Sequence, residues 1–159
     1  MPMIDLTVQN GTLTQSQQER LHDTLIKLII KYERGDQPLP GYEYASRMFL
    51  HFAESVSIAG RIQPPTVSQL IKCIISTPKG SLNAERKADC GQEVVDAILD
   101  ITGRGDRDDD HERIWVIWND VPDSDWRVGN HVVTLRALAK RFKVNPDSDR
   151  YKELVFEAR

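Results

Sequence analysis

Residues 2–8 read Pro-Met-Ile-Asp-Leu-Thr-Val and follow directly on the first methionine. Apolar and polar side chains alternate along residues 3–8, a pattern typical of a strand with one buried face. If Met1 is removed, Pro2 carries a secondary amine fixed to the end of this strand. A terminal amine titrates near about 8, and an apolar pocket disfavours its cationic form. Pro2 is therefore a candidate general base, although many chains begin Met-Pro without catalytic meaning.

The composition is that of an ordinary globular protein. Of its 159 residues, 40% are hydrophobic, which suits one domain or two small fused units. The net charge of -3 and the lack of a basic stripe argue against a nucleic-acid partner. No apolar run reaches the ~18 residues of a membrane span, and residues 1–30 lack the pattern of a signal peptide. We therefore expect no membrane partner and a cytoplasmic location.

Two stretches of the chain follow the same order of strand, helix and strand. In the first, the strand at residues 3–8 is followed by a capping box of Thr14 and Gln17, the signature of a helix start. Apolar residues recur at helical spacing through residues 21–32, and another strand follows at residues 46–52. This order predicts a βαβ unit, in which a crossover helix joins two parallel strands.

The second stretch repeats the first. A strand is expected at residues 70–76, a helix at residues 83–101 and a strand at residues 114–118.

Two pairs of glycines give the register of this repeat. Gly11 and Gly80 are 69 residues apart, and so are Gly60 and Gly129. We therefore expect an α/β fold in which tandem βαβ units form a four-stranded mixed sheet with two helices on one face.

The repeat also sets the expected boundaries within one compact domain. The first unit spans residues 1–62, a linker residues 63–69, and the second unit residues 70–131. A C-terminal helical extension takes residues 132–159, with short helices near residues 133–142 and 148–156. We expect it to cover a sheet edge or a neighbouring subunit, because exposed edges invite pairing.

The pattern resembles the tautomerase superfamily, whose members combine βαβ units with a catalytic N-terminal proline. Pro2 and Gly11 carry the resemblance in the first unit, and residues 76–80, residues 114–122 and the Trp126 to Gly129 segment carry it in the second. The tandem arrangement looks like the malonate semialdehyde decarboxylase and cis-3-chloroacrylic acid dehalogenase groups. The resemblance implies a homotrimer that needs no cofactor.

The resemblance also implies the members of one active site per chain, because Ile71 stands where the second unit would need a proline. Pro2 is the expected catalytic amine. Lys79 matches an arginine that binds a substrate carboxylate, Trp126 an aromatic wall of the pocket, and Glu43 an acidic catalytic residue. The alternatives are a solvated lysine, a core tryptophan and a solvated glutamate.

The chain departs from its relatives in its cations. Single-unit tautomerases carry an arginine just after the first glycine, where this chain has Thr12 and, in the second unit, Ser81. Arg47, Arg61 and Arg127 lie in regions from which one could replace the missing cation. The histidines are scattered without ligand spacing, so no metal site is expected. Two cysteines, at positions 73 and 90, fit neither a metal motif nor a disulfide framework.

These residues leave three functions open. The first is a tautomerase or isomerase of small enol or 2-oxo acids, with the Pro2 amine as general base. The alternative is a decarboxylase or hydratase of small oxo or unsaturated acids, with protonated Pro2 as general acid. Ile117 and Val128 replace the tyrosine and glutamate of the dehalogenase group, which counts against hydrolytic dehalogenation. The third is a noncatalytic assembly or binding member of the fold, which the missing arginines and any retention of Met1 would favour.

Overall fold

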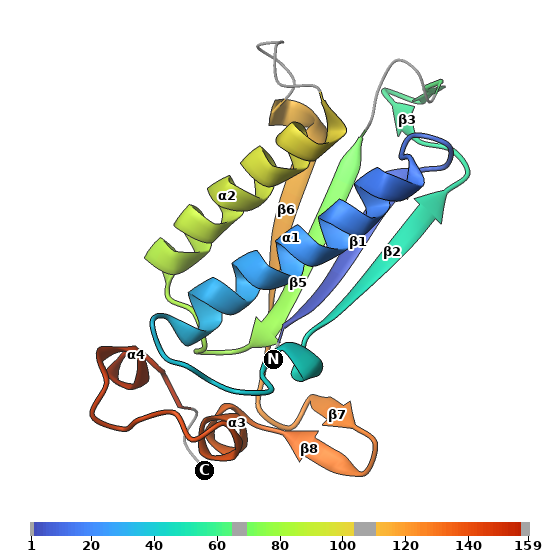
Figure 1. Cartoon of the computed structure of the whole chain (residues 1–159). Coiled ribbons are helices and arrows are strands. Elements are labelled where there is room, and N and C mark those ends of the chain that lie inside the picture. Colours follow the sequence, from blue (N-terminus) through green and yellow to red (C-terminus); the bar gives the residue numbers. More distant parts are fainter. Residues whose placement is uncertain (1, 65–69, 104–110, 157–159) are drawn as a thin grey trace.

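A computed structural model describes residues 2–64, 70–103 and 111–156. Its centre is a four-stranded sheet in the order β2-β1-β5-β6, with α1 and α2 on one face (Figure 1). Strand β1 (Met3–Gln9) is parallel to β2 (Arg47–Ala53) and antiparallel to β5 (Ile71–Pro78). Strand β5 is parallel to β6 (Ile114–Val121). The predicted α/β fold, with two βαβ units in one mixed sheet, is confirmed.

Both helices begin at the side chains that the sequence indicates. Helix α1 (Gln15–Arg34) starts with the predicted capping box, in which the Thr14 hydroxyl accepts from the Gln17 amide at 3.2 Å. Helix α2 (Ala84–Thr102) is capped by Asn83, whose side-chain oxygen accepts from the Arg86 amide at 2.8 Å. A side-chain cap satisfies an amide that the first helical turn leaves unpaired.

The core lies between the helices and the sheet. Alternate residues of β1, namely Ile4, Leu6 and Val8, are fully buried against residues of both helices. Burial of each such side chain contributes roughly 1.5–3 kcal/mol. Because the alternation fixes which face of β1 meets the core, it also fixes the register and so the position of Pro2 at the strand's start.

Each unit ends in a short hairpin, which the sequence did not predict. Strands β3 (Ser57–Ile58) and β4 (Arg61–Ile62) form the first hairpin. Strands β7 (Trp126–Val128) and β8 (His131–Val133) form the second. Gly60 and Gly129 turn these hairpins with φ of +77° and +58°, a conformation that glycine adopts without strain. The 69-residue repeat therefore extends to the backbone conformation of its glycines.

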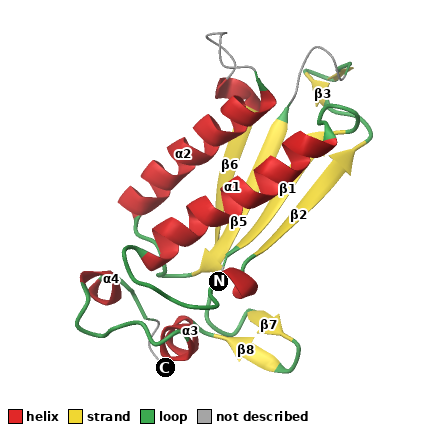
Figure 2. Ribbon diagram, viewed as in Figure 1, coloured by secondary structure: helices red, strands yellow, loops and turns green. Residues whose placement is uncertain are grey.

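The C-terminal extension contains two short helices, α3 (Leu135–Arg141) and α4 (Asp149–Lys152). Figure 2 shows them below the sheet, at the end where the chain starts. The second helix was predicted over residues 148–156 and is shorter. Its chain extends beyond Glu153, where the Val155 amide donates to the Gly80 carbonyl at 3.0 Å instead of continuing the helix.

Two short 3-10 turns complete the described elements, η1 (Glu43–Ala45) and η2 (His111–Arg113). The predicted linker, residues 63–69, lies mostly outside the described residues. None of the described helices is long and apolar enough to cross a membrane.

Candidate active site

Pro2 lies at one end of the sheet, directly before β1. Its side chain is less than 2% exposed, and its carbonyl accepts from the Arg47 amide at 3.1 Å. Because β1 runs antiparallel to β5, with Met3 opposite Ser76, the start of β1 lies beside the end of β5. The start of β2 and the end of β6 reach the same edge. Four strand ends therefore meet around Pro2.

The predicted cations Lys79 and Arg47 lie at this end of the sheet. Lys79 follows β5 directly, its side chain is exposed, and its amide donates to the Val121 carbonyl at 2.8 Å. The Arg47 guanidinium is exposed and donates to the carbonyls of Ser46, at 2.8 Å, and Tyr44. Its Nη1 thus stabilises the turn before β2 through hydrogen bonds to two backbone carbonyls.

Trp126 and Glu43 come from the two short elements beside Pro2. Trp126 is half-buried and packs in a small apolar cluster with Ala45, Val133, Leu138 and Phe142. Glu43 begins η1 with its side chain exposed, and its carbonyl accepts from the Ser46 amide at 3.2 Å. Figure 1 shows η1 and the β7–β8 hairpin near the N-terminal end. Trp126 therefore packs in an apolar cluster, and the Glu43 side chain is exposed to solvent. The predicted roles of both residues in the site stay predictions.

Arg127 lies on the same hairpin, opposite Val132, with its side chain exposed. Nothing among the described contacts brings its guanidinium to Pro2. Arg61 lies in the β3–β4 hairpin. Of the three arginines considered, Arg47 is thus the one whose backbone bonds to Pro2.

Sequence reasoning missed Thr77, the neighbour of Pro2 across the β1–β5 ladder. Thr77 is fully buried, and its hydroxyl has no hydrogen-bond partner within the part of the chain that the structure describes. A buried hydroxyl without a partner is costly, and such groups call for a functional or structural explanation. The signal was available, because the polar pair Ser76-Thr77 directly follows the apolar run from Cys73 to Ile75.

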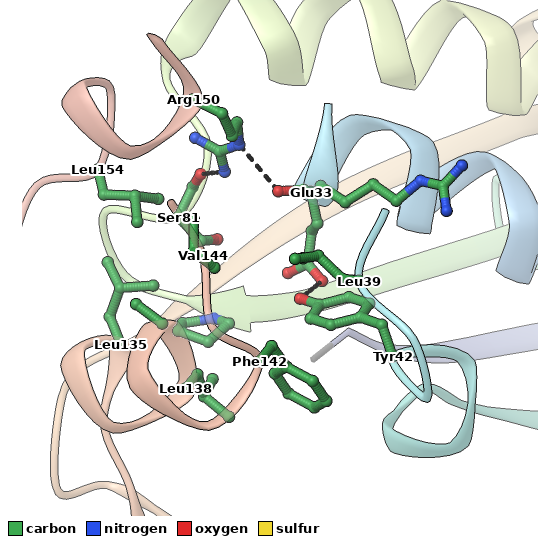
Figure 3. A pocket seen from close by; sticks show the side chains of 13 residues that line it. Glu33, Leu39, Tyr42, Ser81, Leu135, Leu138, Phe142, Val144, Arg150 and Leu154 are labelled. Atoms are coloured by element: carbon green, nitrogen blue, oxygen red, sulfur yellow. Dashed lines mark hydrogen bonds between the residues drawn. The ribbon is translucent and has the colours of Figure 1, made fainter. Parts of the chain in front are cut away.

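A buried polar cluster beside the site was also missed (Figure 3). The Tyr42 hydroxyl donates to the Glu33 carboxylate at 2.5 Å. Arg150 donates from Nε to the Glu33 carbonyl at 2.8 Å and from Nη2 to the Ser81 carbonyl. Burial raises the pKa of Tyr42 well above its ordinary value, and the Glu33 charge adds to this. Tyr42 therefore stays a hydrogen-bond donor.

This cluster borders a cavity of about 30 Å³, between the C-terminal extension, α1 and the segment after β5. Pro78, Ser81, Tyr42 and Phe142 are among its lining residues. The volume suits a water molecule rather than an organic acid. The cavity is therefore a packing feature next to the site and not the substrate pocket.

The cysteines take no part in the site. Burial raises the pKa of Cys73 and of Cys90 to about 12, so both are protonated thiols near neutral pH. A thiol in this form is neither a nucleophile nor a metal ligand.

Comparisons with known proteins agree with this architecture. No protein-family model and no curated protein sequence matches the chain. Among solved structures, it is similar to a member of the cis-3-chloroacrylic acid dehalogenase (cis-CaaD) family, with a TM-score of 0.68 and 16% identity over 95% of this chain and 97% of that chain.

Two further similarities are of the same kind. A native fused 4-OT has a TM-score of 0.65 and 17% identity over 86% of this chain and 98% of that chain. Macrophage migration inhibitory factor from Toxoplasma gondii has a TM-score of 0.61 and 12% identity over 82% of this chain and 99% of that chain. At these identities the likeness concerns the fold, and the chain has the fold of the tautomerase superfamily, as its sequence predicted.

Proposed function

We propose that the chain is a cofactor-independent tautomerase or isomerase of small enol or 2-oxo acids, with the amine of Pro2 as general base after loss of Met1. The observation that carries the proposal is the burial of Pro2 at a strand end shared with Lys79 and Arg47. Burial and nearby cations both lower the pKa of an amine. They favour the neutral form, which accepts a proton.

The proposed reaction moves one proton and leaves the composition of the substrate unchanged. The neutral Pro2 nitrogen takes the proton of the enol hydroxyl while the carbonyl forms. The protonated amine then donates that proton to the neighbouring carbon, which restores the base. Lys79 holds the substrate carboxylate as a point charge, and the Trp126 cluster excludes water from one side.

A homotrimer is part of the proposal. The sheet face opposite the helices presents Phe49, Trp115 and Ile117, which are 49%, 65% and 42% exposed. Three large apolar side chains on one open sheet face are typical of a protein interface. Fused 4-OT proteins of this fold have been solved as trimers.

A second candidate is decarboxylation or hydration of a small oxo or unsaturated acid with protonated Pro2 as general acid. It is supported by the similarity to the cis-CaaD family member, which covers 95% of this chain and thus much of the C-terminal extension. The tyrosine and glutamate of that group are absent from the positions of Ile117 and Val128, which weighs against hydrolytic dehalogenation rather than against decarboxylation or hydration.

The test begins with an intact-mass measurement of the mature chain. Retention of Met1 would make the Pro2 nitrogen a tertiary amide and end the Pro2 mechanism. With Met1 absent, wild type and Pro2→Ala are compared in the ketonisation of a phenylenolpyruvate-type or 2-hydroxymuconate-type enol.

We expect Pro2→Ala to lower kcat/KM by roughly 10²-fold or more, the usual contribution of a general base. Lys27→Ala, a variant of an exposed residue on α1, is the matched control and should retain full activity. Equal rates for wild type and Pro2→Ala would reject the base. If wild type converts 3-oxo acids but not enols, the second candidate is established. If wild type converts neither class of substrate, the noncatalytic role is left.

A further inference from the structure

The segment after β5 is held at three successive residues. The Lys79 amide donates to the Val121 carbonyl of β6 at 2.8 Å. The Gly80 carbonyl accepts from the Val155 amide at 3.0 Å, and the Ser81 carbonyl accepts from Nη2 of Arg150. Two of these three contacts come from the C-terminal extension, about seventy residues further along the chain. The extension therefore holds the two residues that directly follow Lys79.

Arg150 is itself fixed from several sides. Its side chain is only 7% exposed, and its Nε donates to the Glu33 carbonyl near the end of α1 at 2.8 Å. Its Nη1 lies 3.5 Å from the Glu153 carboxylate, which pairs with Arg86 of α2 at 2.6 Å. The guanidinium thus joins the ends of two core helices to the carbonyl of Ser81. A lysine ammonium cannot reach these acceptors in the same fixed geometry.

The extension also approaches the segment as closely as backbones can. A Cβ added at Gly80 would lie 2.0 Å from the Val155 carbonyl oxygen. A contact this close leaves the segment little room to move while the extension is in place.

We propose that Arg150 is a positioning residue, which holds the segment 79–81 and so keeps the Lys79 ammonium in place to bind the substrate carboxylate. This inference rests on the proposed function, in which Lys79 binds that carboxylate near Pro2. A cation held in place before binding loses less freedom when the substrate arrives. Loss of the Arg150 fork therefore weakens substrate binding without touching the amine that transfers the proton.

The kinetic test compares wild type, Arg150→Gln, Arg150→Lys, Lys79→Ala and the double variant Arg150→Gln/Lys79→Ala on the enol acid. We expect Arg150→Gln to raise KM about tenfold with kcat within about twofold of wild type, the pattern for lost uniform binding. Arg150→Lys should restore part of the KM. In the Lys79→Ala background, Arg150→Gln should have no further effect, because residues that act through one another are not additive.

A second readout does not depend on activity. Hydrogen exchange of the backbone amides from Lys79 to Leu82 and of Val155 should be faster in Arg150→Gln and Arg150→Lys than in wild type. Lys152→Ala, which removes an exposed pair with Asp149 on the same helix, is the control and should change neither exchange nor kinetics. Arg150→Lys keeps the charge and most of the stem, so it serves if Arg150→Gln does not fold.

The outcomes separate this inference from the proposed function. Suppose that Pro2→Ala abolishes activity, but Arg150→Gln changes KM equally in the wild-type and the Lys79→Ala background. Pro2 is then supported as the general base, and the positioning role of Arg150 is overturned. Unchanged hydrogen exchange in a folded Arg150 variant also overturns it. If wild type and Pro2→Ala have equal rates, the proposed function fails and the substrate role of Arg150 fails with it, whereas faster exchange still establishes that Arg150 holds the segment.

Discussion

Thr77 places a hydroxyl beside Pro2 in a position where the described residues offer it no partner. We expect Thr77→Val to increase the free energy of unfolding by about 1 kcal/mol, because it removes the desolvation cost of an unpaired group. Thr102→Val is the matched control. The buried Thr102 hydroxyl donates to the Ile98 carbonyl at 2.8 Å, so this variant should lose about 1 kcal/mol. Urea unfolding of both variants checks the prediction, and equal losses would contradict it.

Tyr42 donates a short hydrogen bond to the buried carboxylate of Glu33. A hydrogen bond to a charged group contributes about 1.5–3 kcal/mol, so Tyr42→Phe should lower the free energy of unfolding by that amount. Because burial raises the pKa of Tyr42 well above 10.0, the loss should be the same at neutral and mildly alkaline pH. Tyr44→Phe, at an exposed neighbour, is the control and should have no effect. A loss that disappears as the pH approaches 10.0 would contradict the prediction.

The sequence predicted where single residues lie when their position follows from a nearby strand. Pro2 adjoins the alternating strand β1, and Lys79 follows the apolar strand β5, so both strand ends could be found from the pattern. Arg150 was not predicted, because its contact with Glu33 spans 117 residues and a charged residue in a polar tail normally faces solvent. Arg127 is the opposite case. It was a candidate site residue, but it lies on a hairpin that was not predicted, and its side chain is exposed to solvent.

At the scale of elements, periodicity predicted both helices and all four strands of the sheet. Long amphipathic segments such as α1 have many residues that repeat the same signal, so their existence is well determined. The hairpins were missed because two- and three-residue strands contain too few residues for an alternating pattern. Helix α4 was predicted too long because the tertiary bond between Val155 and Gly80 competes with helical bonds, which the tail's own sequence does not reveal.

Gly80 and Gly11 form a pair that isolates the contact with the extension. Both have nearly the same φ, +80° and +79°, but only the Cβ at Gly80 would meet the extension. Gly11→Ala should cost about 1 kcal/mol for the left-handed conformation alone. Gly80→Ala should cost clearly more, because the Val155 carbonyl must move. Urea unfolding measures both, and a Gly80→Ala cost no larger than that of Gly11→Ala would show that the extension gives way freely.

The pair of Glu153 and Arg86 makes attachment of the extension depend on pH. Arg86 lowers the pKa of Glu153 below 4.5, mainly through their hydrogen bond. A lowered folded-state pKa gives stability that is present above the unfolded-state pKa and is lost as the pH falls through the folded-state pKa. The extension should therefore loosen as the pH falls below the ordinary pKa of a glutamate, about 4.3, and continues through the lowered pKa of Glu153.

Glu153→Gln tests this prediction. The variant should exchange the Val155 amide faster than wild type at neutral pH, and acid should increase its exchange less once the intrinsic pH dependence is subtracted. Asp149→Asn, at the exposed pair with Lys152, is the control and should behave like wild type. An identical acid response in Glu153→Gln and wild type would contradict the role of this pair.

At the scale of the whole molecule, the two faces of the sheet have different roles. The helices cover one face, and the other presents Phe49, Trp115 and Ile117 to solvent in the single chain. Such exposure is costly for a monomer and favourable for an assembly that buries it. The tandem repeat was visible in the sequence, but the exposed apolar face was not, because alternation also predicts a polar outer face for a half-covered sheet.

Ile117→Lys tests whether this face holds the proposed trimer together. A charge at the centre of an apolar interface is costly to bury, so we expect the variant to dissociate into monomers at concentrations where wild type is trimeric. Size-exclusion chromatography with light scattering measures the mass directly. Glu19→Lys, on the solvent side of α1, makes a larger change in net charge and should leave the trimer intact. A trimeric Ile117→Lys would place the subunit contact elsewhere, and a monomeric wild type would refute the proposed trimer. Subunit association through this face buries the sheet and not the end that carries Pro2. Either result would therefore leave the proposed chemistry to be decided by the comparison of wild type with Pro2→Ala.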